Sequence, residues 1–357
     1  MRSDNPFPVK GRGTQINPPN RFESVSREKI TDSDWEVERE TPSPKTQFLP
    51  DASRTIISYN SSPDVGFEAS INPYRGCEHG CAYCYARPTH EYLGFSAGLD
   101  FETKIMVKEK AQELLREELS KRSWKPTVLA MSGVTDPYQP IEQKFRLTRR
   151  CLEVLLEFRN PVVIVTKNHR VVRDKDILSS LAKDQLAVVF ISITTLDRDL
   201  CATLEPRTSR PEKRLEAILN LQSEGIPTGV MVAPVIPGLN DVEIPRILQE
   251  AAQAGARFAG MVPLRLPYAV APLFEEWLES YLPVQKKKIL NRIRSIRGGA
   301  LNDPHFGSRM AGEGVFAKQI QDLFEMACKK SGMNREEMPL SKAHFRHLSS
   351  SQLSLFE

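Results

Sequence analysis

The segment LTRRCLEVLLEFRNPVVIVT, residues 147–166, decides the fold class of this chain because it joins a helical pattern directly to a strand pattern. Apolar side chains recur at helical spacing from Leu147 to Phe158. Val162–Val165 is a continuous apolar run, which is typical of a strand covered by helices on both faces. The segment therefore predicts one helix-to-strand unit of a parallel α/β sheet.

The same alternation continues on both sides of this segment. Further apolar runs of strand length occur at Ala69–Ile71, Thr127–Met131, Val188–Ile193, Thr228–Ala233 and Phe258–Val262. Amphipathic helical intervals lie at Val107–Arg122, Pro211–Glu224 and Val242–Ala254. Six strands alternating with helices predict an α/β fold, a partial (β/α)6 TIM-like barrel, with its active site at the carboxyl ends of the strands.

Composition divides the rest of the chain around this barrel, which we assign to residues 61–272. Residues 1–60 are rich in Pro, Ser, Arg and Glu without a periodic apolar pattern, and we expect a disordered or extended N-terminal segment. Residues 273–347 are expected to form a basic helical C-terminal region, and residues 348–357 a flexible tail.

Residues 76–84, GCEHGCAYC, contain three closely spaced cysteines, Cys77, Cys81 and Cys84. Thiolates select iron–sulfur clusters or zinc, and three of them leave one ligand position open. Cys151, Cys201 and Cys328 are isolated, so a fourth cysteine at paired spacing is missing from the sequence. His79 could complete a zinc site, so the residues alone leave both a cluster and zinc open.

The spacing CxxxCxΦC, with the aromatic Tyr83 before the last cysteine, resembles the signature of the radical S-adenosyl-L-methionine (SAM) superfamily. The resemblance implies a 4Fe-4S cluster held by Cys77, Cys81 and Cys84, with SAM on the remaining iron. It also implies an external electron donor, reductive cleavage of SAM to a 5′-deoxyadenosyl radical, and hydrogen abstraction from a substrate.

The same resemblance implies which other residues contact SAM. The literal Gly-Gly-Glu motif after the second strand is absent, and the stretch from Ser132 to Asp136 stands in its place. The implied cofactor-binding residues are Tyr83, Ser132, Gly133, Thr135, Asp136, Lys167, Ser192, Thr194, Glu205 and Arg214.

Within the superfamily, residues 72–77 (NPYRGC), 135–142 (TDPYQPIE), 166–168 (TKN) and 204–207 (LEPR) resemble the spore photoproduct lyase-related group, including its uncharacterised bacterial members. This implies DNA or another nucleic acid as substrate, in a repair context. One departure concerns the hydrogen-donating cysteine of that lyase, because Gly133-Val134 stand in its place. Cys151 and Cys201 are the remaining candidates for a donor, although a buried structural thiol explains both.

The C-terminal residues Gln352, Leu353, Ser354, Leu355 and Phe356 resemble the short peptide by which bacterial repair proteins bind the DNA sliding clamp. Leu355 and Phe356 would be the apolar anchors of such a contact. The alternative is a tail that packs on its own core. Two function classes follow: a radical SAM enzyme, or a non-catalytic iron–sulfur accessory protein recruited to the clamp.

Charge is unevenly distributed along the chain. The net charge is +4, but residues 284–347 contain 13 Lys or Arg against six Asp or Glu. The run Lys286-Lys287-Lys288, followed by Arg292, Arg294 and Arg297, could bind phosphates or form the solvated face of a helix over Ile289, Ile293 and Ile296. Six unpaired cysteines and no apolar run of about 18 residues predict a cytoplasmic protein without a membrane span.

Overall fold

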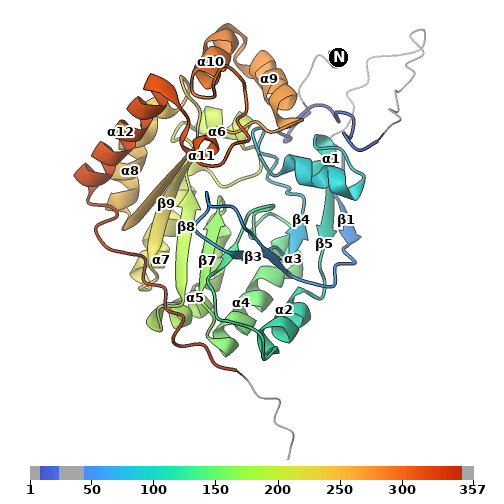
Figure 1. Cartoon of the computed structure of the whole chain (residues 1–357), viewed down its shortest axis with the longest axis vertical. Coiled ribbons are helices and arrows are strands. Elements are labelled where there is room, and N and C mark those ends of the chain that lie inside the picture. Colours follow the sequence, from blue (N-terminus) through green and yellow to red (C-terminus); the bar gives the residue numbers. More distant parts are fainter. Residues whose placement is uncertain (1–8, 24–43, 348–357) are drawn as a thin grey trace, which may run out of the picture.

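The computed structural model describes residues 9–23 and 44–347, which contain the whole predicted barrel (Figure 1). The predicted clamp-binding residues Gln352, Leu353, Leu355 and Phe356 lie outside the described residues. Helices long and apolar enough to cross a membrane are absent from the described part of the chain.

A seven-stranded sheet in the order β10-β9-β8-β7-β6-β3-β2 forms the centre of the molecule. Its parallel strands are β3 (Ala69–Ile71), β6 (Leu129–Met131), β7 (Val162–Thr166), β8 (Ala187–Ser192), β9 (Thr228–Val235) and β10 (Phe258–Pro263). The short strand β2 (Ile57–Tyr59) pairs antiparallel with β3 at one edge. The six parallel strands are the six predicted ones, so the partial-barrel prediction is confirmed.

Amphipathic helices cover the outer face of this sheet (Figure 1). They are α2 (Ala111–Ser120), α4 (Leu147–Phe158), α5 (Lys175–Lys183), α7 (Pro211–Ser223) and α8 (Ile244–Gln253). On α4 the side chains of Leu152, Leu155 and Phe158 are at most 1% exposed. Burying each such side chain stabilises the fold by roughly 1.5–3 kcal/mol, which explains why the apolar periodicity located this helix correctly.

A second, three-stranded sheet was not predicted. It has the order β1-β5-β4, from β1 (Gln47–Pro50), β5 (Lys104–Val107) and β4 (Tyr74–Arg75). Lys104–Val107 therefore pairs as a strand, and the helix predicted from Val107 starts only at Ala111. Pairing partners that lie far apart in sequence decide such short strands, and local propensity does not reveal them.

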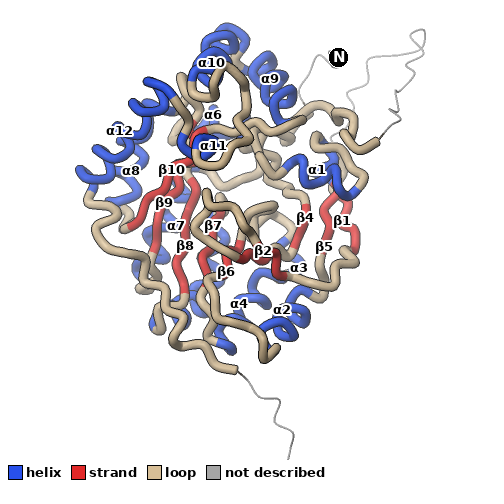
Figure 2. The backbone as a smooth tube through the Cα atoms, in the orientation of Figure 1, coloured by secondary structure: helices blue, strands red, loops and turns tan. Residues whose placement is uncertain are grey.

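Shorter helices and a C-terminal helical region complete the fold. The short helices are η1 (Arg87–Leu93), α1 (Leu99–Thr103), α3 (Glu142–Phe145), η2 (His169–Asp174), α6 (Arg198–Leu204), η3 (Asp241–Glu243) and α11 (Ser308–Ala311). The longer C-terminal helices are α9 (Val270–Tyr281), α10 (Pro283–Ser295) and α12 (Gly314–Ser331). Figure 2 shows long loops between the central sheet and helices α1, α9 and α10.

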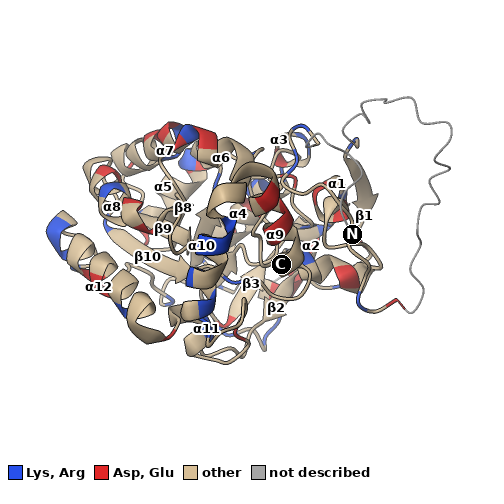
Figure 3. Ribbon diagram, turned by 90° about the horizontal axis from the view of Figure 1, so that it is seen from above, with Lys and Arg blue, Asp and Glu red and all other residues tan. Residues whose placement is uncertain are grey.

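Helix α10 carries the basic run that the sequence singled out, and Figure 3 shows its Lys and Arg residues together. Ile289 and Ile293 on this helix are fully buried, as the solvated-helix interpretation expects. Arg297 does not belong to the exposed basic face. It is 3% exposed and donates to the carbonyls of Leu264 (2.7 Å) and Arg309 (2.8 Å). The Arg297 guanidinium therefore binds backbone carbonyls inside the protein.

Part of the N-terminal segment packs against the barrel. In the described portion, β1 and β2 form between residues 47 and 59, and Arg12 and Thr14 are buried. The domain boundaries at residues 60, 272 and 347 stay predictions.

Candidate functional site

The three clustered cysteines lie in the loop that connects β4 to η1. Cys77 and Cys81 are buried, Cys84 is half-buried, and all six cysteines of the chain are free thiols. Backbone bonds fold the loop into successive turns, from the Gly80 N–H to the Cys77 carbonyl (3.3 Å) and from the Cys84 N–H to the Cys81 carbonyl (3.2 Å). The spacing read from the sequence therefore brings three thiols into one compact loop.

The segment that follows β6 binds this loop through hydrogen bonds of two side chains. The side-chain oxygen of Gln139 accepts from the Glu78 N–H (2.9 Å), and its amide nitrogen donates to the Gly76 carbonyl (3.2 Å). Thr135 donates its hydroxyl to the same Gly76 carbonyl at 2.7 Å. Both side chains are buried. Thr135, predicted to contact SAM, thus supports the cysteine loop in this structure.

Burial opposes the ionisation of Cys81 and Cys84. Burial raises the pKa of Cys84 to about 11 and places that of Cys81 well above its usual value, while the charge of Lys167 opposes the shift at both. Metal binding ionises such thiols and releases their protons. Three free thiols in one loop, two buried and one half-buried, thus match the three-cysteine ligand set of an iron–sulfur cluster.

Both ring nitrogens of His79 have polar partners in this structure. Its Nδ1 lies 3.4 Å from the Asp136 carboxylate, and its Nε2 lies 3.1 Å from the Asn168 amide nitrogen. The Asn168 oxygen already accepts from the Arg170 N–H, which fixes the amide so that its nitrogen donates to His79. Within residues 9–23 and 44–347, no three His, Cys, Asp or Glu side chains converge on one metal-ion position.

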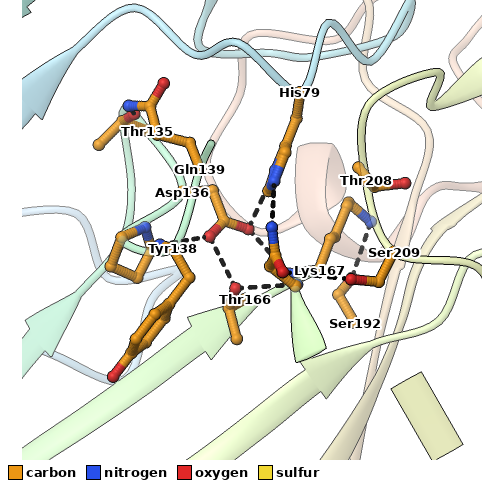
Figure 4. Close-up of polar contacts among 12 residues, drawn as sticks. His79, Thr135, Asp136, Tyr138, Gln139, Thr166, Lys167, Ser192, Thr208 and Ser209 are labelled. Atoms are coloured by element: carbon orange, nitrogen blue, oxygen red, sulfur yellow. Dashed lines mark hydrogen bonds and ion pairs between the residues drawn. The ribbon is translucent and has the colours of Figure 1, made fainter. Parts of the chain in front are cut away.

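Asp136 is the centre of a first polar network at the carboxyl ends of β6 and β7, and Figure 4 shows it pointing toward His79 and Thr166. It accepts from the Thr166 hydroxyl (2.6 Å) and from the Lys167 N–H (2.7 Å). Burial alone would raise its pKa, but His79 and these two donors hold the pKa below its usual value. Asp136 therefore stays ionised and connects the cysteine loop to β7.

Lys167 is the centre of a second network, which begins where β7 ends. Its ammonium donates to the hydroxyls of Ser192 and Thr194, both at 2.9 Å, and to the Ala233 carbonyl at 3.0 Å. It also pairs with Glu205 at 3.1 Å and lies 5.6 Å from the centre of the Tyr83 ring. Strands β7, β8 and β9 thus converge on one ammonium group.

Glu205 and Arg214 form the enclosed side of this network. Their carboxylate and guanidinium pair directly, and both side chains are 0% exposed. Arg214 also donates to the carbonyls of Ser209 (2.7 Å) and Ser192 (2.9 Å). Burial of Glu205 would raise its pKa, but the charges of Arg214 and Lys167 hold that pKa far below its usual value.

Tyr83 joins the cysteine loop to this network, because its hydroxyl donates to Glu205. Eight of the ten predicted SAM contacts therefore carry hydrogen bonds to other protein groups. The other two, Ser132 and Gly133, are half-buried at the end of β6, where Gly133 has φ 115° and open space around its missing Cβ. Whether the ten residues contact SAM stays a prediction.

Three polar residues of the site were not predicted as site residues, namely Gln139, Asn168 and Ser209, and His79 was named only as a possible zinc ligand. Gln139 and Asn168 lie inside motif stretches quoted from the sequence, residues 135–142 and 166–168, so those stretches were the available signal. Ser209 bonds to Asn168 (3.2 Å) and His169 (2.9 Å) only because α7 packs beside η2.

The two isolated cysteines near the barrel differ in position. Cys151 is fully buried in the hydrophobic core on α4. Cys201, on α6, has its sulfur 3.8 Å from Glu205 and 3.5 Å from Arg214. Only Cys201 therefore touches the polar networks of the site.

A family model described as the radical SAM superfamily matches residues 71–251, which is half of the chain. The chain belongs to this superfamily and is a radical SAM enzyme. Membership implies a 4Fe-4S cluster and SAM as cofactors, and the three thiols described above fit the cluster.

Relatives in sequence come from bacteria, archaea and a phage. An uncharacterized protein of Mycobacterium bovis is 34% identical over 232 residues, covering 64% of this chain and 67% of the relative. An uncharacterized protein of Methanocaldococcus jannaschii is 32% identical over 184 residues, covering 52% and 66%. The radical SAM Nalpha-GlyT isomerase of Pseudomonas phage M6 is 27% identical over 220 residues, covering 60% and 43%.

Solved structures of spore photoproduct lyase share the fold. The lyase complexed with dinucleoside spore photoproduct matches with a TM-score of 0.59 and 19% identity, over 80% of each chain. A mutant of it with bound AdoMet and the same dinucleoside matches with a TM-score of 0.57 and 18% identity, again over 80% of each chain. The chain therefore resembles spore photoproduct lyase in its fold.

Proposed function

We propose that this enzyme holds a 4Fe-4S cluster through Cys77, Cys81 and Cys84, binds SAM at the open iron, and abstracts hydrogen from a nucleic-acid substrate. One observation carries the proposal. Tyr83 lies inside the cysteine loop, and its hydroxyl reaches Glu205 in the Lys167 network. The thiols and the polar strand ends therefore belong to one site, where a parallel barrel of this kind places its active site.

Each group of residues has a distinct role in this proposal. The three cysteines would hold the cluster, and the bound cluster would supply the electron for reductive cleavage of SAM to methionine and a 5′-deoxyadenosyl radical. Lys167 is the candidate for contact with SAM, because its side chain is 15% exposed whereas the Glu205 side chain is 0% exposed. Glu205 and Arg214 hold Lys167 and Tyr83 in place.

An exposed aromatic surface beside the cysteine loop supports a nucleic-acid substrate. Tyr85 follows Cys84 directly, is 52% exposed, and has the Arg265 guanidinium 5.8 Å from its ring centre. Tyr268, on the same loop as Arg265, is 69% exposed and has the Arg21 guanidinium 3.9 Å from its ring. Exposed aromatic rings next to arginines are the elements on which unpaired bases stack.

The comparisons support the same substrate class, since spore photoproduct lyase is complexed with a dinucleoside. We propose damaged DNA, in a repair context, as the first substrate to test. The Gly133-Val134 pair stands where that lyase carries its hydrogen-donating cysteine, so the proposed reaction is not repair of the spore photoproduct itself.

Deuterium transfer tests this proposal. The anaerobically reconstituted, reduced protein is given SAM together with deuterated oligonucleotides carrying candidate lesions, undamaged DNA or RNA in turn. The substrate is the one whose deuterium appears in 5′-deoxyadenosine. Tyr268→Ala is expected to weaken oligonucleotide binding, and Tyr59→Ala, on the edge strand β2 and 72% exposed, is the matched control. Deuterium transfer from none of the nucleic acids would refute the substrate class.

We further propose that the tail recruits the enzyme to the bacterial sliding clamp through Gln352, Leu353, Leu355 and Phe356. The support is the five-residue match and its position after Ser349-Ser350-Ser351. Family membership favours an enzyme brought to the clamp over a non-catalytic accessory protein. An external electron donor belongs to the same proposal, because SAM cleavage consumes an electron.

A further inference from the structure

Residues 9–23 form an N-terminal strap that lies next to α1 (Figure 1) and contacts the cysteine loop. The closest approach is between two glycines. A Cβ on Gly13 would lie 1.6 Å from the Gly80 carbonyl oxygen and 3.1 Å from the Ala82 nitrogen. Gly80 and Ala82 flank Cys81, so the strap backbone touches the loop at this cysteine, and only glycine fits at residue 13.

A buried carboxylate connects the strap to the loop. Glu102 is 0% exposed and accepts from the Gly13 N–H (3.1 Å) and from the Thr14 hydroxyl (3.0 Å). The same carboxylate pairs with Arg87 at 2.6 Å. Arg87, also fully buried, donates Nε (3.0 Å) and Nη2 (2.8 Å) to the Cys81 carbonyl.

These contacts hold the Cys81 backbone from two directions. Gly13 packs on Gly80 and Ala82, the neighbours of Cys81. Arg87 binds the Cys81 carbonyl in an orientation that Glu102 fixes. Thr14 and Gly13 supply two of the donors that satisfy the Glu102 carboxylate, and a buried charge that loses donors is strongly destabilised. Loss of the strap contacts would therefore loosen Arg87 and, through it, Cys81.

We propose that the strap is a positioning element of the cluster site: Gly13 and Thr14, acting through Glu102 and Arg87, hold Cys81 and restrict access to its thiol. This goes beyond the proposed reaction and is independent of the substrate. It assigns a role in metal retention to a segment whose sequence predicts only an extended chain.

Thiol alkylation of the cluster-free protein tests the proposal without any catalysis. The full chain is treated with iodoacetamide under native conditions, and labelling at each cysteine is followed by peptide mass spectrometry. Thr14→Val preserves the side-chain shape but removes the hydroxyl, and a lost hydrogen bond to a charged group shifts a local opening about tenfold or more. Labelling of Cys81 should accelerate by that factor, whereas Thr14→Ser should restore the wild-type rate.

Two further variants bracket this result. Gly13→Ala should accelerate Cys81 labelling more strongly than Thr14→Val, while Gly66→Ala should leave it unchanged, because a Cβ at Gly66 meets no atom within 4 Å. Cys151, in the core, reports global unfolding. If Gly13→Ala also exposes Cys151, the comparison of Thr14→Val with Thr14→Ser decides the question.

The loaded protein gives a second readout, since cluster loss to a chelator, followed by absorbance, should accelerate in the same order. Wild-type labelling of Cys81 in a folded Thr14→Val protein would overturn the proposal. Equal acceleration in Thr14→Ser and Thr14→Val would overturn it as well, because the hydroxyl would then be irrelevant.

Discussion

Replacing Arg214 by Met is expected to destabilise the protein more than any single change of a surface charge. The guanidinium is fully buried and pairs with the equally buried Glu205. It also donates to the Ser209 carbonyl (2.7 Å), the Ser192 carbonyl (2.9 Å) and the Thr208 hydroxyl (2.6 Å). Methionine fills part of the volume but donates to none of these acceptors.

The expected loss in the free energy of unfolding is about 3–5 kcal/mol, the range for removing one partner of a buried ion pair. Two opposing contributions set the value within that range. Each acceptor left unsatisfied adds roughly 1–3 kcal/mol. Lys167, 3.1 Å from Glu205, still compensates its charge and limits the loss. We therefore do not expect the separate contributions to add.

Urea unfolding of the cluster-free protein, followed by circular dichroism in reductant, measures this loss. The matched control is Arg198→Met, because Arg198 also pairs with a glutamate, Glu212, but its side chain is 67% exposed. Such exposed pairs contribute at most about 1 kcal/mol. The double variant Arg214→Met/Glu205→Gln should recover part of the stability, since it removes a buried charge that Lys167 alone compensates only in part. A loss in Arg214→Met no larger than in the Arg198 control would refute this reasoning.

Three further predictions concern the metal, the tail and the pH dependence. Replacing Cys77, Cys81 or Cys84 by Ala should abolish the absorbance of the reconstituted 4Fe-4S cluster while circular dichroism stays unchanged; stoichiometric zinc without iron in the anaerobically purified protein would contradict the cluster. Deleting residues 352–357 should abolish binding to the bacterial sliding clamp in a titration and leave SAM cleavage intact, whereas a lower melting temperature without any clamp binding by the intact chain would favour the packed-tail alternative. Burial lowers the pKa of His90 from 6.5 to about 4, so the unfolded chain binds the extra proton between these values and stability falls as the pH drops. Between pH 7 and pH 5, the free energy of unfolding of His90→Phe should therefore fall by about 2 kcal/mol less than that of the wild type. Equal falls for the two proteins in urea unfolding would argue against a neutral buried His90.

The parallel strands and the helices that cover them were readable from the sequence, and the reason is local. Each strand such as Val162–Thr166 is buried between layers, and each helix such as α4 buries one stripe, so apolar periodicity records their positions directly. The cluster of three cysteines was equally readable, because their spacing already places all three within a single loop.

The second sheet and the strap were not readable, because both depend on partners far along the chain. Lys104–Val107 is a strand only because β1 and β4 lie beside it. Gly13 looks ordinary in a Pro- and Arg-rich segment until the fold places it against Gly80.

The sequence by itself determined the superfamily, the barrel and the position of the three clustered cysteines, since a short motif and a repeated apolar period carry that information. Only the tertiary structure decided what the polar residues at the strand ends do. Glu205 and Arg214 bury their charges in each other and Asp136 binds His79, whereas the Lys167 side chain stays partly exposed. The physical reason is that a charged residue's role depends on which partners surround it, and here those partners come from strands and loops far apart in the chain.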